Sequence, residues 1–238
     1  FGGDEAAKVG GDDDRRKQRS LGDPRKPTED EVEDHRRRGH LPYRNWCSVC
    51  VRAKGKDLDH RKAVGESREI SEYCFDYCFP GDELGFKLTV LVGRERLTGM
   101  NFASAIPTKG SSGRFVVDRA LELVDEVGDA NAKVIIKSDQ EPAVKVFVKD
   151  LIAARAEGRT VVEESPVGSS GSNGVVERSV WGVEAQIRAL FLALEERLQV
   201  TVDPKWPIVA FIPEYAAYLL NRLEVGKDGK TAHERVRG

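Results

Sequence analysis

Long hydrophobic runs, methionine and cysteine are all scarce in this chain. No run approaches the roughly 18 apolar residues of a membrane-spanning helix, and no basic-then-apolar leader opens the sequence, so we expect neither a membrane protein nor a secreted one. Met100 is the only methionine and Phe1 comes first, so we expect a segment cut from a longer polypeptide. Without a leader, the four cysteines favour metal binding in a reducing compartment over disulfides.

Net charge is also nearly lacking, at −2 over 238 residues, but the charges are unevenly spread. Residues 1–34 carry seven Lys and Arg against eleven Asp and Glu, residues 35–69 carry ten against four, and residues 70–238 carry twenty-one against twenty-five. A basic segment of net charge +6 therefore lies between two acidic ones. Such a segment is typical of contacts with phosphate backbones, although a solvated basic surface has the same composition.

Apolar periodicity is missing from residues 1–34. We predict that this tail is disordered, because it cannot bury enough surface to offset its ordering entropy. The rest of the chain is long enough for one ordinary domain with a small appendage. We place a zinc-binding module at 35–62, a linker at 63–69 and the main domain at 70–238.

The main domain alternates strand-like and helix-like segments. The expected strands are 70–79, 86–92, 98–107, 134–136 and 160–162, and the expected helices are 113–127, 142–156, 176–198 and 208–223. A glycine- and serine-rich loop, 168–174, precedes the longest helix. This order predicts an α/β domain with a mixed five-stranded sheet and flanking helices, as in the ribonuclease H-like fold.

Three carboxylates stand out by position. Asp76 interrupts an aromatic strand, Asp139 follows the apolar strand 134–136, and Glu177 lies in the first turn of the longest helix. Each has a plain structural reading: an exposed position on an edge strand, a helix cap and a capping box, respectively, although Gly174 weakens the last one. Together, two strand acids and one helix acid can converge at one end of a sheet.

Convergent carboxylates suit phosphodiester chemistry. Their oxygens bind Mg²⁺ or Mn²⁺, and two such ions can activate the attacking oxygen and stabilise the leaving one. No histidine lies between His60 and His233, which fits a reaction that needs no side-chain base. Cys74 and Cys78, which flank Asp76, are expected to be small buried hydrophobic side chains.

Three segments, ISEYCFDYCF, IIKSDQEP and SNGVVER, resemble the acidic motifs of retroviral and retrotransposon integrases, and copia-type retrotransposon polyproteins in particular. EYAAYLLNRL followed by GKTAHE is similar to the end of that catalytic core, so the resemblance covers residues 35–238. It implies a ribonuclease H-like enzyme, a polynucleotidyl transferase that processes DNA 3′ ends and transfers strands. Asp76, Asp139 and Glu177 would then be its catalytic residues and would bind two Mg²⁺ or Mn²⁺ ions.

Histidine and cysteine gather in the basic segment, in the pattern His35-x4-His40-x6-Cys47-x2-Cys50, with His60 further along. A Cys-x2-Cys pair beside histidines fits one tetrahedral structural Zn²⁺. We favour His35, His40, Cys47 and Cys50 as ligands, with His60 as an alternative to His35. Free thiols with surface histidines are the plain alternative. The pattern resembles the His-His-Cys-Cys module that precedes integrase cores.

The expected partners are DNA, both the ends of the element and the target, and further copies of this chain, as in other integrases. The same resemblance implies a cytoplasmic particle that later reaches the nucleus. Two other functions stay open: an inactive nucleic-acid-binding or assembly module from a decayed element, and a ribonuclease H-like nuclease. The side chains expected to contact nucleic acid are Arg36, Arg37, Arg38, Arg44, Arg52, Lys54, Arg178 and Arg188.

Overall fold

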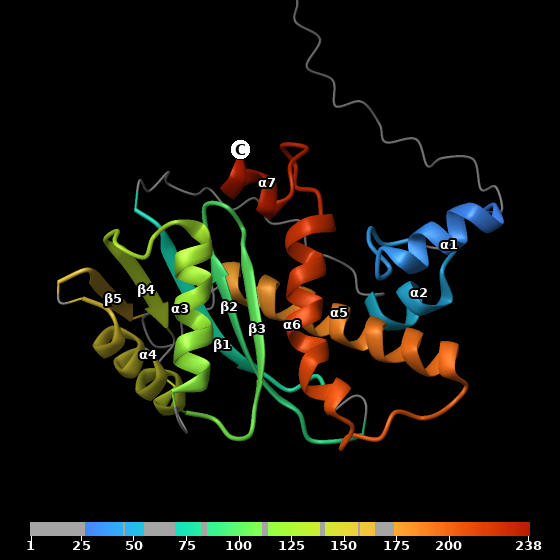
Figure 1. Cartoon of the computed structure of the whole chain (residues 1–238), viewed down its shortest axis with the longest axis horizontal. Coiled ribbons are helices and arrows are strands. Elements are labelled where there is room, and N and C mark those ends of the chain that lie inside the picture. The colour runs from blue at the N-terminus through green and yellow to red at the C-terminus, as the bar shows by residue number, and fades with distance from the viewer. Residues whose placement is uncertain are drawn as a thin grey trace, which may run out of the picture.

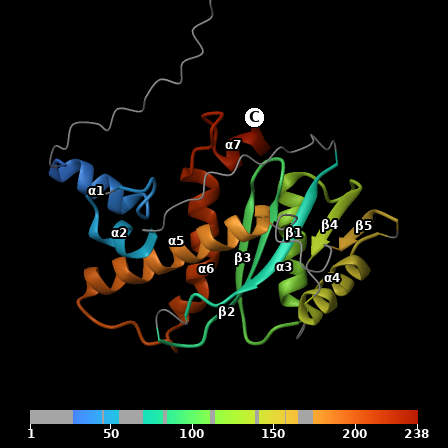
Figure 2. The same cartoon turned by 180° about the vertical axis from the view of Figure 1, so that it is seen from behind.

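Helices cover both faces of a five-stranded sheet in the computed structural model (Figures 1 and 2). It describes residues 27–44, 46–54, 70–81, 85–110, 114–138, 141–156, 158–164 and 174–238. The strands are β1 (Glu72–Cys78), β2 (Thr89–Glu95), β3 (Asn101–Ile106), β4 (Val134–Ser138) and β5 (Thr160–Glu164). The helices are α1 (Glu29–Arg37), α2 (Ser48–Lys54), α3 (Phe115–Val127), α4 (Pro142–Ala154), α5 (Gly174–Leu198), α6 (Pro207–Leu223) and α7 (Ala232–Arg237).

The strand order is β3-β2-β1-β4-β5. β1, β2 and β3 form an antiparallel meander, and β4 and β5 continue the sheet in parallel to β1. Sequence order and sheet order together confirm the predicted α/β class, a mixed five-stranded sheet of ribonuclease H-like topology. β1 lies in the middle, so a polar side chain on it is placed at the centre of the sheet.

Each face of the sheet has its own core. Tyr73, Phe75 and Tyr77 of β1 pack with α3 and α4, while Cys78 packs with buried side chains of α5 and α6. Because side chains alternate along a strand, Asp76 shares the face of Cys78. α5 crosses this second face, as Figure 2 shows from behind.

β2 begins and ends three residues later than predicted. The charged stretch after Val92 was expected to end the strand, but Gly93, Arg94 and Glu95 pair with β1. A Cβ at position 93 would lie 2.6 Å from the Phe75 ring, so glycine leaves room for this ring beside β2. The fully buried Glu95 carboxylate accepts hydrogen bonds from the backbone N–H groups of Leu97 and Thr98, at 2.8 and 2.6 Å, which offsets its desolvation.

The predicted bounds of the disordered tail, residues 1–34, overlap a helix. Helix α1 begins at Glu29, so the prediction for residues 29–34 is wrong; residues 1–26 lie outside the described part of the chain. A capping box starts the helix: the Thr28 hydroxyl accepts from the Glu31 N–H at 3.2 Å, and Glu31 accepts from the Thr28 N–H at 2.8 Å. The prediction followed the polar composition of residues 1–34 and overlooked this capping box.

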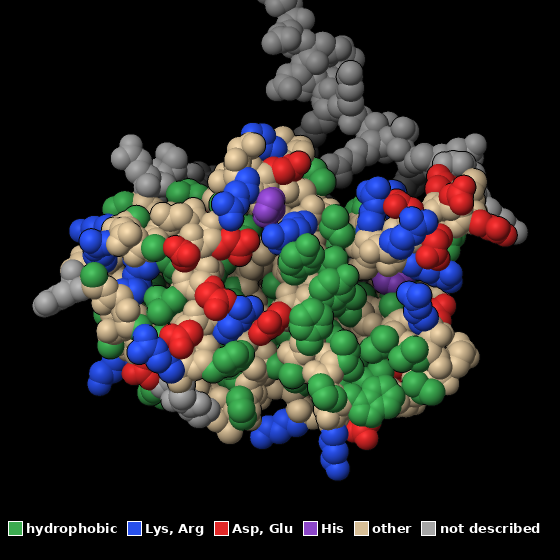
Figure 3. Space-filling model, in the orientation of Figure 1, with side chains coloured by type: hydrophobic (Ala, Val, Ile, Leu, Met, Phe, Trp, Pro, Cys, Tyr) green, Lys and Arg blue, Asp and Glu red, His purple; other side chains and the backbone are tan. Residues whose placement is uncertain are grey.

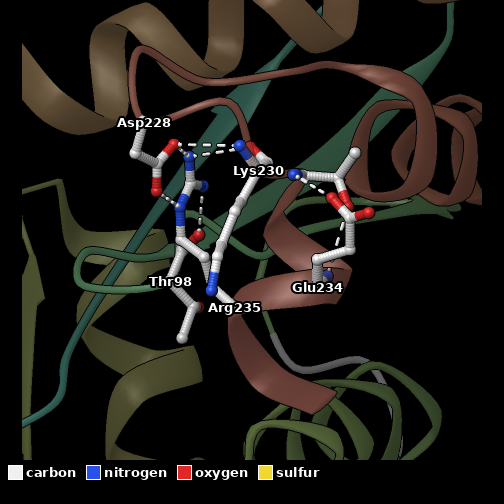
Figure 4. A network of polar contacts seen from close by, with 6 residues as sticks. Thr98, Asp228, Lys230, Glu234 and Arg235 are labelled. Carbon is white, nitrogen blue, oxygen red and sulfur yellow. Dashed lines mark hydrogen bonds and ion pairs between the residues drawn. The ribbon is translucent and has the colours of Figure 1, made fainter. Parts of the chain in front are cut away.

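Helix α7 was also missed, because it is short and has little apolar periodicity. A second capping box, Thr231 with Glu234, begins it. Arg235 donates to the Thr98 carbonyl oxygen at 2.8 Å and to Asp228, which fastens the end of the chain to the β2–β3 hairpin (Figure 4). The Arg235 guanidinium holds the pKa of Asp228 well below its usual range.

Hydrophobic side chains gather on the surface over α6 (Figure 3). Phe211, Tyr215 and Tyr218 are exposed and stack along the helix, with ring centroids 5.8 and 6.1 Å apart. Arg222 covers the end of this row, 4.0 Å from the centre of the Tyr218 ring. In the described part of the chain, no helix combines the length and the apolar character that crossing a bilayer requires.

Candidate functional site

Four predicted metal ligands come together between α1 and α2. His35 lies in the last turn of α1, His40 follows Gly39, Cys47 precedes α2 and Cys50 lies within α2. All four side chains are buried, and their ligand atoms lie within 4.8 Å of one another. His40 Nδ1 is 3.3 Å from Cys47 Sγ, and His35 Nε2 is 3.3 Å from Cys50 Sγ.

This donor set fits zinc. Ordinary Zn–S and Zn–N lengths place sulfur and nitrogen about 3.6 Å apart along the edge of a tetrahedral site. The two nitrogen–sulfur distances here are slightly shorter than that, so an ion needs only a small outward shift of the ligands. His60, the alternative ligand, lies outside the described residues.

A cavity and an aromatic ring lie beside the His-Cys cluster. A cavity of about 170 Å³ beside it is lined by His35, His40 and Cys47 and by Glu196 of α5. The Trp46 ring meets the His35 ring edge-on, 5.0 Å between centroids. Neither Trp46 nor Glu196 was singled out from the sequence; tryptophan directly before the first cysteine was the available signal.

The cluster is attached to the main domain. Cys50, Val49 and Ala53 pack against Ala189 of α5, and Leu41 belongs to the core beneath α5 and α6. The Gln186 side chain of α5 donates to the Gly39 carbonyl oxygen. The residues predicted as a separate module therefore share buried surface with the domain at 70–238.

The basic residues near the cluster divide by exposure. Arg36 and Arg37 on α1, and Arg38 directly after it, are exposed, and Glu33 or Asp34 lies within 4.0 Å of each guanidinium group. Arg44 and Arg52 are exposed as well, while the side chain of Lys54 lies outside the described part. Exposed, flexible cations can reach phosphate oxygens, and surface ion pairs of this kind are weak competitors.

Asp76 occupies the middle of the sheet. It lies half-buried on β1, and its Oδ1 accepts from the Tyr77 backbone N–H at 2.7 Å. β1 is not an edge strand, so the plain reading of Asp76 as an edge residue is wrong. A half-buried carboxylate on a central strand suits a hard cation, which prefers oxygen ligands.

Asp139 lies outside the described residues, and with it the helix-cap reading. The neighbouring strand is described: the parallel ladder of β1 and β4 ends with the pair Phe75 and Ser138. These are the residues directly before Asp76 and Asp139 in the sequence. The described ladder thus ends one residue before each of the two aspartates in the sequence.

Glu177 lies in the first turn of α5 with an exposed side chain. A helix turns by about 100° per residue. Glu184, two turns after Glu177, therefore lies on the same side of α5 as Glu177, while Ser179 lies on the opposite side. Ser179 is buried and contacts Asn101 of β3. Glu184 instead hydrogen-bonds the Cys78 thiol of β1. The flank of α5 that carries Glu177 therefore faces β1, the strand of Asp76.

Glu184 of α5 and Asp76 of β1 both lie near the Cys78 thiol, which agrees with α5 facing β1. Burial raises the pKa of the Cys78 thiol, and the negative charges of Glu184 and Asp76 raise it further. Burial likewise raises the pKa of Cys74 to about 12, with the Glu72 carboxylate as the next cause. Both thiols therefore behave as the small buried side chains that the sequence predicted.

Two predicted DNA contacts on α5 differ in exposure. Arg178, beside Glu177, is exposed. The Arg188 side chain is only 12% exposed, and its guanidinium lies 4.0 Å from the Glu184 carboxylate. Arg188 thus lies largely inside the protein, which does not favour contact with a phosphate.

The chain matches no protein-family model, and no curated protein matches it. Among solved structures, it is similar to the catalytic core domain of BIV integrase, with 19% identity over 70% of this chain and 93% of that one, at a TM-score of 0.47. It is also similar to the HTLV-2 integrase catalytic core domain in complex with magnesium (trimeric form). The identity there is 17% over 68% of this chain and 93% of that one, at a TM-score of 0.46.

A third similar structure is the simian T-cell lymphotropic virus intasome in complex with PP2A regulatory subunit B56 gamma. It gives 14% identity over 70% of this chain and 55% of that one, at a TM-score of 0.47.

Proposed function

We propose that this chain is the zinc-binding module and catalytic core of a retroelement integrase, of the copia type that its motifs resemble. The placement of Asp76 carries the proposal: it lies on the central strand, on the face crossed by α5, whose Glu177 flank turns toward β1. The SNGVVER and IIKSDQEP motifs and the His-Cys cluster support it independently. The reaction is processing of DNA 3′ ends and their transfer to target DNA.

Asp76, Asp139 and Glu177 would hold two Mg²⁺ or Mn²⁺ ions. When bound, such ions lower the pKa of the attacking water or 3′-hydroxyl and stabilise the charge on the leaving oxygen. The chain's own task is to hold carboxylate oxygens in place. The Tyr77 N–H fixes Asp76 Oδ1, and the packing of α5 on β1 and β2 fixes the turn that carries Glu177.

His35, His40, Cys47 and Cys50 would hold one structural Zn²⁺, which would tie α1 to α2. The exposed cations on this module would position DNA through its phosphates without reading sequence. Self-association, and passage from a cytoplasmic particle to the nucleus, belong to the same proposal. The proposed DNA-contacting side chains are Arg36, Arg37, Arg38, Arg44, Arg52, Lys54 and Arg178.

The test is DNA cleavage and strand transfer on a branched oligonucleotide that mimics an integration intermediate, with Mn²⁺ or Mg²⁺. We expect product from the unaltered chain and a loss of at least about 100-fold in Asp76→Asn, because removing a metal-binding charge removes the ions' contribution. Asp118→Asn is the matched control: Asp118 is an acid on α3, 2.9 Å from Arg114 and away from α5.

Other outcomes separate the alternatives. DNA binding without any metal-dependent product would contradict the enzyme and favour an inactive assembly module. Cleavage restricted to the RNA strand of RNA–DNA hybrids would favour a ribonuclease H-like nuclease. Equal activity in Asp76→Asn and Asp118→Asn would place the reaction elsewhere.

A further inference from the structure

Four polar side chains from four elements meet beside the first turn of α5. They are Arg94 of β2, Asn101 of β3, Ser179 of α5 and Asn221 of α6. Asn101, Ser179 and Asn221 are each 5% exposed or less. Burying so many polar groups is costly unless each finds a partner, and here the partners are one another.

We call these four side chains the polar hub, and Asn101 lies at its centre. Its Oδ1 accepts from the Ser179 hydroxyl at 2.8 Å and from Arg94 Nη1 at 2.8 Å. Its Nδ2 and its backbone N–H both donate to Asn221 Oδ1, at 3.1 and 2.7 Å. Asn221 Nδ2 returns a bond to the Asn101 carbonyl oxygen at 2.8 Å. Exchanging O and N in the Asn101 amide would set N–H groups against the Arg94 guanidinium, so its orientation is fixed.

An apolar contact at this place would bury area equally well but would not be directional. A satisfied hydrogen-bond network holds one arrangement, because a shift of any element leaves a buried donor or acceptor without a partner. Ser179 is the member on α5, two residues after Glu177. Its bond to Asn101 therefore fixes the rotation of the turn that carries Glu177, from the flank opposite to it.

We propose that Asn101, clamped by Asn221, is a positioning residue that acts through Ser179 to hold Glu177 toward Asp76 on β1. This inference rests on the proposed function, since it concerns the carboxylates assigned to the metal ions. None of the four hub residues contacts DNA or metal in this account. Their role is to hold α5 in one rotation before the ions bind.

The test compares Ser179→Ala with Ser179→Thr, which keeps the hydroxyl. The matched control is Ser104→Ala: Ser104 is buried on β3 too, but its hydroxyl bonds to Glu214 of α6, 3.4 Å away. Mn²⁺ affinity is measured by electron paramagnetic resonance on the zinc-loaded chain without DNA, and kcat and KM are measured on the branched oligonucleotide.

We expect Ser179→Ala to weaken Mn²⁺ binding and lower kcat by roughly tenfold each, the usual effect of losing a group that orients a metal ligand. KM for DNA and the thermal midpoint should stay at the values of Ser104→Ala, and Ser179→Thr should restore both lost quantities. If Ser179→Ala does not fold, Asn221→Ser is tested in its place. Its shorter side chain cannot make the same hydrogen bonds to Asn101, and we expect the same losses.

Wild-type Mn²⁺ affinity and kcat in the variant tested would overturn the positioning role. Failure of the proposed function looks different: Glu177→Gln would then leave Mn²⁺ affinity and product formation unchanged. A loss in Glu177→Gln with no loss in Ser179→Ala therefore rejects the inference alone.

Discussion

At the scale of single residues, the four cysteines fall into two chemically different pairs. Cys74 and Cys78 lie within β1, where burial and neighbouring carboxylates raise their thiol pKa. Cys47 and Cys50 lie beside two histidines at zinc-binding distances. The same residue type is thus a buried, protonated thiol in the sheet and a candidate metal ligand between α1 and α2.

Alkylation should separate the pairs. Because a raised pKa keeps a thiol protonated below that pKa, we expect Cys74 and Cys78 to resist iodoacetamide at pH 8 with or without zinc. Cys47 and Cys50 should resist it only while zinc is bound and react after chelation. Peptide mass spectrometry of the labelled chain measures this. Labelling of β1 in the native, zinc-loaded chain would contradict the packing described here.

The zinc ligands have a direct test as well. We expect one zinc per chain by elemental analysis, and its loss in His35→Ala, because three remaining donors leave the tetrahedral site open. His60→Ala is the control and should keep its zinc. The opposite pattern would show that His60, not His35, completes the site.

Residue types and spacing were enough to predict much of the site. The Cys-x2-Cys pattern and two histidines gave the cluster, because such ligands are local in sequence. Asp76 was proposed as a metal ligand because an aspartate inside an aromatic strand needs a partner that offsets its desolvation. Arg188 was predicted to contact DNA; its low exposure, 12%, could not be read from the sequence, since its pairing with Glu184 depends on how α5 lies against β1. Ser179, Asn101 and Asn221 were missed, because their bonds span up to 120 residues.

At the scale of elements, the turn after α1 decides how the zinc module sits on the main domain. Gly39 has φ +60°, and a Cβ there would lie 2.4 Å from Leu219 Cδ1 of α6. Leu219 is buried, so it has little room to move away. Glycine is therefore required both by the backbone and by the close approach of α6.

We expect Gly39→Ala to lower the free energy of unfolding by about 2–3 kcal/mol, from left-handed strain plus the clash. Gly128→Ala is the matched control: φ is +99° there and nothing lies within 4 Å, so only strain of about 1 kcal/mol applies. Urea unfolding of the zinc-loaded chain measures both. Equal losses would mean that the module does not approach α6 as closely as the structure has it.

Periodicity found the long elements and missed the short ones. β1, β4, α3 and α5 were predicted nearly in place, because their apolar side chains repeat over several turns or a whole strand. The bounds of β2 were shifted, since a strand that carries a buried, hydrogen-bonded glutamate looks like a loop in the sequence. α1 and α7 start with capping boxes that local reading could have found.

At the scale of the whole molecule, α5 joins the two proposed metal sites. Its first turn carries Glu177, and its later turns carry Gln186 and Ala189, which contact the zinc module. The sequence predicted the order of elements and hence the sheet, because consecutive elements mostly lie side by side. It could not predict that the module packs on α5, since this contact depends on side chains far apart in the chain.

Zinc removal should therefore be felt in the main domain. We expect chelation to lower the thermal midpoint and to speed hydrogen exchange at the backbone amides of α5 around Gln186 and Ala189, because the buried contacts of the module are lost. Exchange in β4, on the far side of β1, serves as the internal control. Unchanged exchange in α5 would show that the module and the main domain are independent.

Asp76, Asp139 and Glu177 are proposed to bind divalent cations together, and a crystal of the zinc-loaded chain grown with Mn²⁺ would test this arrangement. We expect anomalous density for manganese between Asp76 on β1 and Glu177 on α5, with an Asp139 oxygen in its coordination sphere. Crystals with the Glu177 carboxylate turned away from β1 and no manganese at Asp76 would contradict it.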